Sequence, residues 1–165
     1  MEVALFAERT KRMSYNLGMS SDTAVKKVRS QGFTLPDEPD FNIPELPADI
    51  TAVHSAELMV LFGQFESWLS YVEVQLAAAE IDEKGEQTAL DVVSAGLQID
   101  NKGAAKTVSE LKSIVMMDES YGKQEEKVST AYAYRKVIET IYRRLDRAKF
   151  LISREITRRG FQRDA

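Results

Sequence analysis

Apolar residues recur along the last third of the chain at alternating steps of four and three positions. At about 100° per residue this spacing keeps them on one narrow stripe, the seam that a partner helix covers. The pattern predicts one long helix over 134–159. Its large apolar residues are Tyr134, Ile138, Ile141, Leu145, Ala148 and Ile152.

A second seam with the same steps runs through the middle of the chain. It holds Leu58, Phe62, Phe65, Leu69, Val72, Leu76 and Ala79, and the register resumes at Leu90, Val93 and Leu97. We expect a helix from about 55 to 97 that either continues through Gly85 or bends there. Trp68 and Tyr71 widen the apolar surface beyond the seam, more than a two-helix hairpin covers.

That surplus of apolar surface predicts a homo-oligomer. We expect the packing residues, within the chain and between copies, to be Phe62, Phe65, Trp68, Leu69, Val72, Ile138, Ile141 and Leu145.

Turn signals divide the two helical regions. The stretch 98–103 contains Asn101 and Gly103 and is predicted to be the turn. Residues 104–117 are helical in composition, whereas the polar stretch 118–127 predicts a kink, a break or an exposed segment. The expected fold is therefore all-α, with arms of about 55–97 and 104–159 in a long antiparallel hairpin.

The N-terminal part differs in kind. Short helices are expected at 2–16, stopped by Gly18, and at 22–31, stopped by Gly32. Four prolines are then interleaved with carboxylates up to about residue 50, which predicts an extended, polyproline-like segment. We call residues 33–54 the strap, and it is either a linker or a segment bound across another subunit. The predicted division is a helical arm at 1–32, the strap at 33–54 and the hairpin at 55–161.

Charge is distributed in blocks along the chain. The formal net charge is −4, yet residues 32–83 carry 11 acidic and no basic groups, and residues 135–165 carry 10 basic against 4 acidic groups. The blocks therefore say more about partners than the average does.

The basic groups of the long C-terminal helix concentrate on one face. They are spaced by seven and four positions, roughly opposite the apolar seam, and extend about 33 Å along the axis. This basic stripe is a candidate nucleic-acid-binding site, formed by Lys136, Arg143, Arg147, Arg154 and Arg158. Glu139, Asp146 and Glu155 fall beside it. A solubilising surface is the alternative interpretation. Tyr142, Phe150 and Phe161 lie near the cations, and we expect Tyr142 to be a packing residue.

Catalytic chemistry has little support in the sequence. The chain has no cysteine and one histidine, His54, which precedes a predicted helix and is expected to be a polar cap. No phosphate-binding glycine loop, nucleophile elbow or metal-ligand spacing is present. We therefore expect a protein that is not an enzyme, with no cofactor and no metal. No leader and no apolar run of membrane-spanning length is seen, which predicts a soluble, intracellular protein without a membrane partner.

The C-terminal region resembles a known family. Lys106, Thr107 and Val108 open a helix, a charged stretch follows, and a long basic helix closes on Arg158, Arg159, Gly160 and Phe161. Over about 104–161 this resembles the second half of the UvsY-type recombination mediators of T-even bacteriophages. They too have a Lys-Thr-Val and a long terminal helix with a Gly-Phe pair. In the family that pair lies inside the terminal region, whereas here it lies close to the last residue, and the acidic first half has no counterpart.

The resemblance implies an oligomer that binds single-stranded DNA and helps a recombinase displace single-strand-binding protein. Such a protein acts in the cytoplasm, that of the host if it is encoded by a phage. The alternative is a structural or adaptor component of a large assembly, such as a virion protein, whose basic stripe holds an acidic protein.

Overall fold

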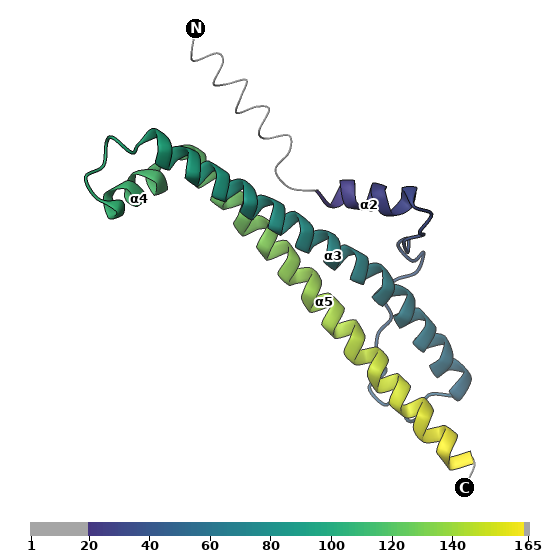
Figure 1. Cartoon of the computed structure of the whole chain (residues 1–165). Coiled ribbons are helices and arrows are strands. Elements are labelled where there is room, and N and C mark those ends of the chain that lie inside the picture. Colours follow the sequence, from purple (N-terminus) through teal and green to yellow (C-terminus); the bar gives the residue numbers. More distant parts are fainter. Residues whose placement is uncertain (1–19, 164–165) are drawn as a thin grey trace. The chain divides into compact units, whose positions relative to one another are not determined.

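The computed structural model describes residues 20–163, with side chains up to residue 160, so the helix predicted at 2–16 lies outside the described part. The described residues form four helices and no strand (Figure 1): α2 (Ser21–Ser30), α3 (Ser55–Asp100), α4 (Val108–Met117) and α5 (Glu119–Arg163). They belong to two compact units. The described part of unit 1 is 20–30 with 78–135, and that of unit 2 is 31–77 with 136–163.

In each unit a part of α3 packs against a part of α5 that runs the opposite way. In unit 2, Ser55 contacts Arg159 while Glu66 contacts Lys149, so positions rise along one helix as they fall along the other. In unit 1, Glu83 contacts Arg135 while Glu86 contacts Gln124, which gives the same opposite order. The predicted all-α class and the antiparallel hairpin are confirmed.

The boundaries of α3 and α4 differ from the predicted ones. α3 continues through Gly85 without a break and ends at Asp100. The helix therefore includes the first three residues of the stretch 98–103 that was predicted to be the turn. α4 begins at Val108 rather than near 104, because the Thr107 side chain accepts a hydrogen bond from the Glu110 backbone N–H (3.1 Å) and caps the helix. The Glu110 carboxylate in turn accepts from the backbone N–H of Lys106 (2.8 Å).

A single residue, Asp118, separates α4 from α5. Its extended backbone ends α4, and its side chain accepts from the backbone N–H of Ser120 (2.8 Å), which caps α5. The predicted break at 118–127 is therefore confined to its first residue, and α5 begins at Glu119, well before position 134. α5 also continues past Gly160 to Arg163.

In unit 1, α2 is fixed to α3 by one acidic side chain. Asp82 accepts hydrogen bonds from the backbone N–H (2.9 Å) and the hydroxyl (2.7 Å) of Ser21, at the start of α2. The cap of α2 is Ser20, two residues before the start predicted at position 22. Deeper in the unit, the buried Gln124 of α5 donates to the carbonyl of Glu86 on α3 (3.1 Å).

Unit 2 contains the main apolar core. Both predicted seams supply it, and burial of a side chain such as Leu58 or Ile152 stabilises the fold by roughly 1.5–3 kcal/mol. The buried members are Leu58, Phe65, Trp68, Leu69, Val72, Leu145, Ala148 and Ile152. Tyr134, predicted on the seam, is in contrast 54 % exposed in unit 1.

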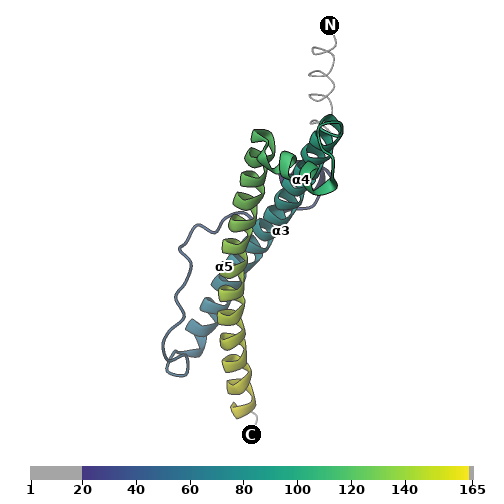
Figure 2. The same cartoon turned by 90° about the vertical axis from the view of Figure 1, so that its left-hand side faces the viewer.

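The strap forms no helix or strand and runs as an extended segment, as predicted (Figure 2). The surface that it contacts belongs to its own chain. The Trp68 Nε1–H donates to the carbonyl of Phe41 (3.1 Å), and the two rings meet edge to face at 6.5 Å between centroids. Phe41 and Val53 pack against the core. The strap therefore covers part of the surplus apolar surface from which a homo-oligomer was predicted.

The end of the strap is held by one arginine of α5. Arg159 donates five hydrogen bonds of 2.7–3.1 Å, which employ every N–H of the guanidinium. The acceptors are the carboxylate of Glu155, the carbonyls of Ile50, Thr51 and Val53, and the hydroxyl of Ser55. His54, between these acceptors, receives the Ala56 backbone N–H on Nδ1 (3.3 Å), which confirms its predicted capping role.

Replacing Arg159 tests this anchor. Arg159→Met leaves the carbonyls and Glu155 short of donors, and we expect the unfolding free energy to fall by about 2–3 kcal/mol. The exposed Arg154→Met is the matched control and should change it by less than about 0.5 kcal/mol. Urea denaturation followed by circular dichroism measures both. Equal effects of the two substitutions would contradict the anchoring role.

A candidate binding face on α5

The solvent-facing side of α5 in unit 2 carries all five residues of the basic stripe. The five side chains are exposed, and they lie on the side of the helix away from Leu145 and Ile152, which face the core. The structure thus places them together along one helix. Their electrostatic surroundings differ, however.

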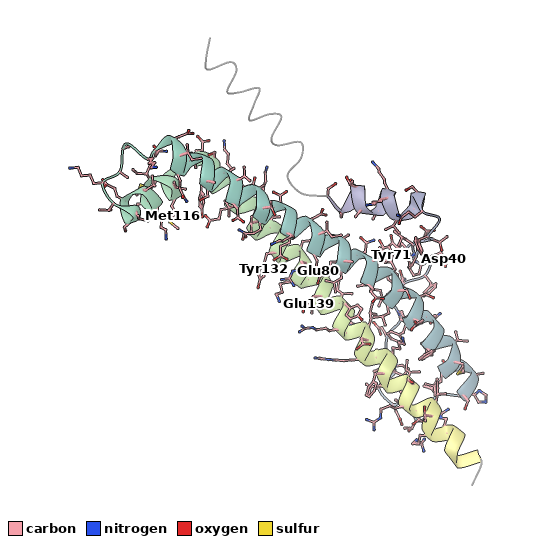
Figure 3. The ribbon with its side chains drawn as sticks, viewed as in Figure 1. Asp40, Tyr71, Glu80, Met116, Tyr132 and Glu139 are labelled. Carbon is pink, nitrogen blue, oxygen red and sulfur yellow. The ribbon has the colours of Figure 1, made fainter. Side chains whose placement is uncertain are left out.

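Two cations of the stripe share one acid. Glu139 projects from α5 (Figure 3) and accepts from Lys136 at 3.1 Å, and its other oxygen pairs with Arg143. Steps of three and four residues bring these side chains together on a helix. Glu139 falls beside the stripe in the helical projection, but its side chain reaches two of the cations.

A third cation is held at the far end. Arg158 donates to both oxygens of Glu155, at 2.8 and 2.7 Å, and Arg159 donates to one of them. Glu155 is 5 % exposed, and these bonds lower the pKa of its carboxyl from 4.5 to about 2, with Arg158 the larger cause. The same contact raises the pKa of the Arg158 guanidinium.

The two remaining cations flank an exposed aromatic ring. Arg147 and Arg154 have no carboxylate partner within residues 20–160. The guanidinium carbon of Arg154 lies 5.5 Å from the ring centroid of Phe150, which is 57 % exposed. Arg147, Phe150 and Arg154 are spaced three and four residues apart, so they share one face of α5. We call them the Arg-Phe-Arg cluster.

Next to this cluster lies an open groove of about 460 Å³ between α5 and the strap. Its apolar lining comes from the strap, from α5 and from Phe65 of α3, and three arginines line it as well. The residues are Ile43, Pro44, Leu46, Phe65, Thr140, Arg143, Arg144, Leu145, Arg147, Ala148 and Leu151. No carboxylate is among them. The groove depends on the strap, so helical periodicity alone does not reveal it.

The opposite charge is concentrated in the strap and the first part of α3. Residues 31–77 carry eight carboxylates and no lysine or arginine. Glu66 pairs with Lys149 of α5. The other seven are exposed and have no lysine or arginine partner in the described part of the chain: Asp37, Glu38, Asp40, Glu45, Asp49, Glu57 and Glu73. Unit 2 therefore has segregated acidic and basic surfaces.

The predicted packing residues all lie in the core of unit 2. Phe65, Trp68, Leu69, Val72 and Leu145 are buried, and Phe62, Ile138 and Ile141 are partly buried against them. Tyr142 also packs there, as expected, while Phe161 lies outside the residues whose side chains are described.

Two arginines were not singled out from the sequence. Arg159 holds the strap, and Arg144 lines the groove. The position of Arg159 in the sequence did indicate a structural role. It falls near the apolar seam, and a charged side chain that is buried there needs hydrogen-bond partners. Arg144 flanks the stripe in the helical projection, but its place in the groove depends on the strap, which the projection does not include.

No family model, no curated protein and no solved structure matches the chain. Among the helices of residues 20–163, none contains an apolar stretch of the length that a membrane crossing requires. The same residues contain no group of three or more histidine, aspartate or glutamate side chains placed to hold a metal ion. The chemistry of the α5 face is therefore the basis for a functional proposal.

The Glu155 contacts predict a defined response to acid. Because the pKa of Glu155 is lowered, its ionised form contributes stability above about pH 4.5, and this contribution is lost as the pH falls towards 2. We expect the thermal midpoint of the wild type to fall more steeply across this window than that of Glu155→Gln. Circular dichroism melts measure it. The exposed Glu73→Gln should follow the wild type, and an unchanged acid response of Glu155→Gln would refute the assignment.

Proposed function

We propose that this protein is a non-enzymatic, single-stranded DNA-binding accessory protein, of the kind that mediates recombination in bacteriophages. The observation that carries the proposal is the Arg-Phe-Arg cluster. It combines two exposed guanidinium groups without carboxylate partners in the described residues with an exposed aromatic ring.

The chemistry of this cluster fits a single strand. Guanidinium groups bind phosphate oxygens without regard to sequence, and a free aromatic face stacks on an unpaired base. Arg147 and Arg154 are about 10 Å apart along the axis, so a strand that follows α5 meets both. Arg143, which is 65 % exposed although paired with Glu139, extends the track by one turn.

The rest of the proposal rests on the resemblance to UvsY-type mediators over 104–161. From this resemblance we propose that the protein is encoded by a phage and acts in the cytoplasm of the host. Its proposed partners are a recombinase and a single-strand-binding protein. The described fold adds a long basic terminal helix, which suits such a role.

The alternative role is an adaptor or virion component in which the basic stripe holds an acidic protein. One observation favours it. Lys136, Arg143 and Arg158 already pair with glutamates of the same helix, so this face presents positive and negative groups side by side, which a protein surface can match and a uniformly negative phosphate backbone cannot.

Charge reversal separates the two roles. Arg147→Glu with Arg154→Glu should weaken binding of every labelled oligonucleotide alike, because phosphate contacts are independent of sequence. The slope of log affinity against log salt should flatten by roughly 0.7 for each phosphate contact removed. Fluorescence anisotropy at several salt concentrations measures both quantities.

The matched control is Lys102→Glu with Lys112→Glu, which makes the same charge change at two exposed residues of unit 1. It should leave the slope close to that of the wild type. Absence of oligonucleotide binding by the wild type at low salt would contradict DNA binding and favour the adaptor role.

We also propose that the protein is a homo-oligomer. Part of the apolar surface that suggested this lies under the strap, but Met59 and Val60 of α3 remain 55 % and 60 % exposed. Light scattering at micromolar concentration should give a mass that is a multiple of the 18.6 kDa chain. Met59→Asp with Val60→Asp should lower that mass without loss of helix. A wild-type mass of one chain would exclude self-association.

A further inference from the structure

The groove between α5 and the strap has a composition that the proposed DNA binding does not use. Aliphatic and proline side chains from both segments line it, and Leu151 on its α5 side is 44 % exposed. Arg143, Arg144 and Arg147 line it too, and no carboxylate does. The groove therefore offers apolar contact and positive charge side by side.

From this pairing we infer that the groove is a docking site for an extended acidic segment of a partner protein. Leucine, isoleucine or proline side chains of the segment occupy the apolar lining, and its carboxylates pair with the arginines. Arginine favours this ligand because its planar fork matches a carboxylate with two parallel hydrogen bonds. The charge of the groove selects an acidic partner over a basic one.

The lining favours a peptide over a nucleobase. Bases bind sequence-tolerant sites by stacking on exposed aromatic faces. The one aromatic residue that lines the groove is Phe65, which is 2 % exposed and belongs to the core. The exposed ring of Phe150 is not part of the lining.

The strap is an example, within the same chain, of the kind of segment that binds to unit 2. It is an extended acidic segment that lies on the two helices through apolar side chains, among them Phe41. Its exposed acids, such as Glu45, do not line the groove, whereas the neighbouring Pro44 and Leu46 do. A second segment of the same kind fits beside it, with the strap as one wall.

Arg147 belongs both to the groove and to the Arg-Phe-Arg cluster. An acidic segment in the groove and a strand on the cluster therefore compete for one cation. The docking inference does not require DNA binding, since Arg144 and Leu151 lie outside the cluster.

The test uses the full chain and a fluorescein-labelled peptide of sequence Glu-Leu-Pro-Glu-Ile-Glu. Two matched peptides carry lysine in place of each glutamate, or serine in place of leucine and isoleucine. We expect the acidic apolar peptide to bind at least about tenfold more tightly than either control. Arg144→Gln should weaken it about tenfold and Leu151→Ser several-fold, because one removes a charge-assisted pair and the other apolar contact. Oligonucleotide affinity should change less than twofold in both variants.

Circular dichroism checks that both variants keep the wild-type helix content. If Arg144→Gln does not fold, the peptide affinity of Leu151→Ser alone tests the inference. Leu151 is partly exposed, so this substitution should not unfold the protein. Equal binding of the three peptides, or peptide binding that ignores both substitutions, overturns the inference. Loss of oligonucleotide binding in Leu151→Ser with no effect on the peptide shows instead that the groove holds bases. Failure of DNA binding alone leaves the peptide result intact, so the two proposals fail separately.

Discussion

The organisation of unit 2 depends on the guanidinium group of Arg159. This one side chain bonds at once to the end of the strap, the start of α3 and an acid of α5. The fixed fork of five donors explains why arginine occupies this position, because an ammonium group offers three donors. The acid that it shares, Glu155, also holds Arg158 on the outer face. Internal anchoring and surface charge are therefore linked through one carboxylate.

The segregation of charge in unit 2 is the second organising feature. The pair of Lys149 with Glu66 neutralises only one of the eight carboxylates of residues 31–77. The other seven are exposed and have no lysine or arginine partner in the described residues. Exposed pairs contribute at most about 1 kcal/mol each to stability, so selection for folding does not explain the arrangement. The proposed binding of charged partners would account for it, and such binding should be sensitive to salt.

The sequence was sufficient to predict elements whose signal is periodic or local. The core positions Phe65, Leu69 and Leu145 followed from steps of four and three, and the break near Asp118 followed from a polar stretch. The surface beneath the strap was not predictable, because prolines define an extended backbone but not what it covers. The pairing of Glu139 with two cations of the stripe was within reach of the sequence, since Lys136 and Arg143 lie three and four residues away on the same helix. The helical projection hid it, because a projection records where a side chain begins and not how far it reaches.

The prolines of the strap have a consequence for solubility. An extended segment on a protein surface normally presents a row of backbone donors and acceptors that can recruit the strand of another molecule and begin aggregation. Pro36, Pro39, Pro44 and Pro47 have no N–H to offer, and they interrupt that row at intervals of three to five residues. The exposed carboxylates between them add mutual repulsion between copies. The strap thus remains extended without acting as a template for intermolecular β-sheet.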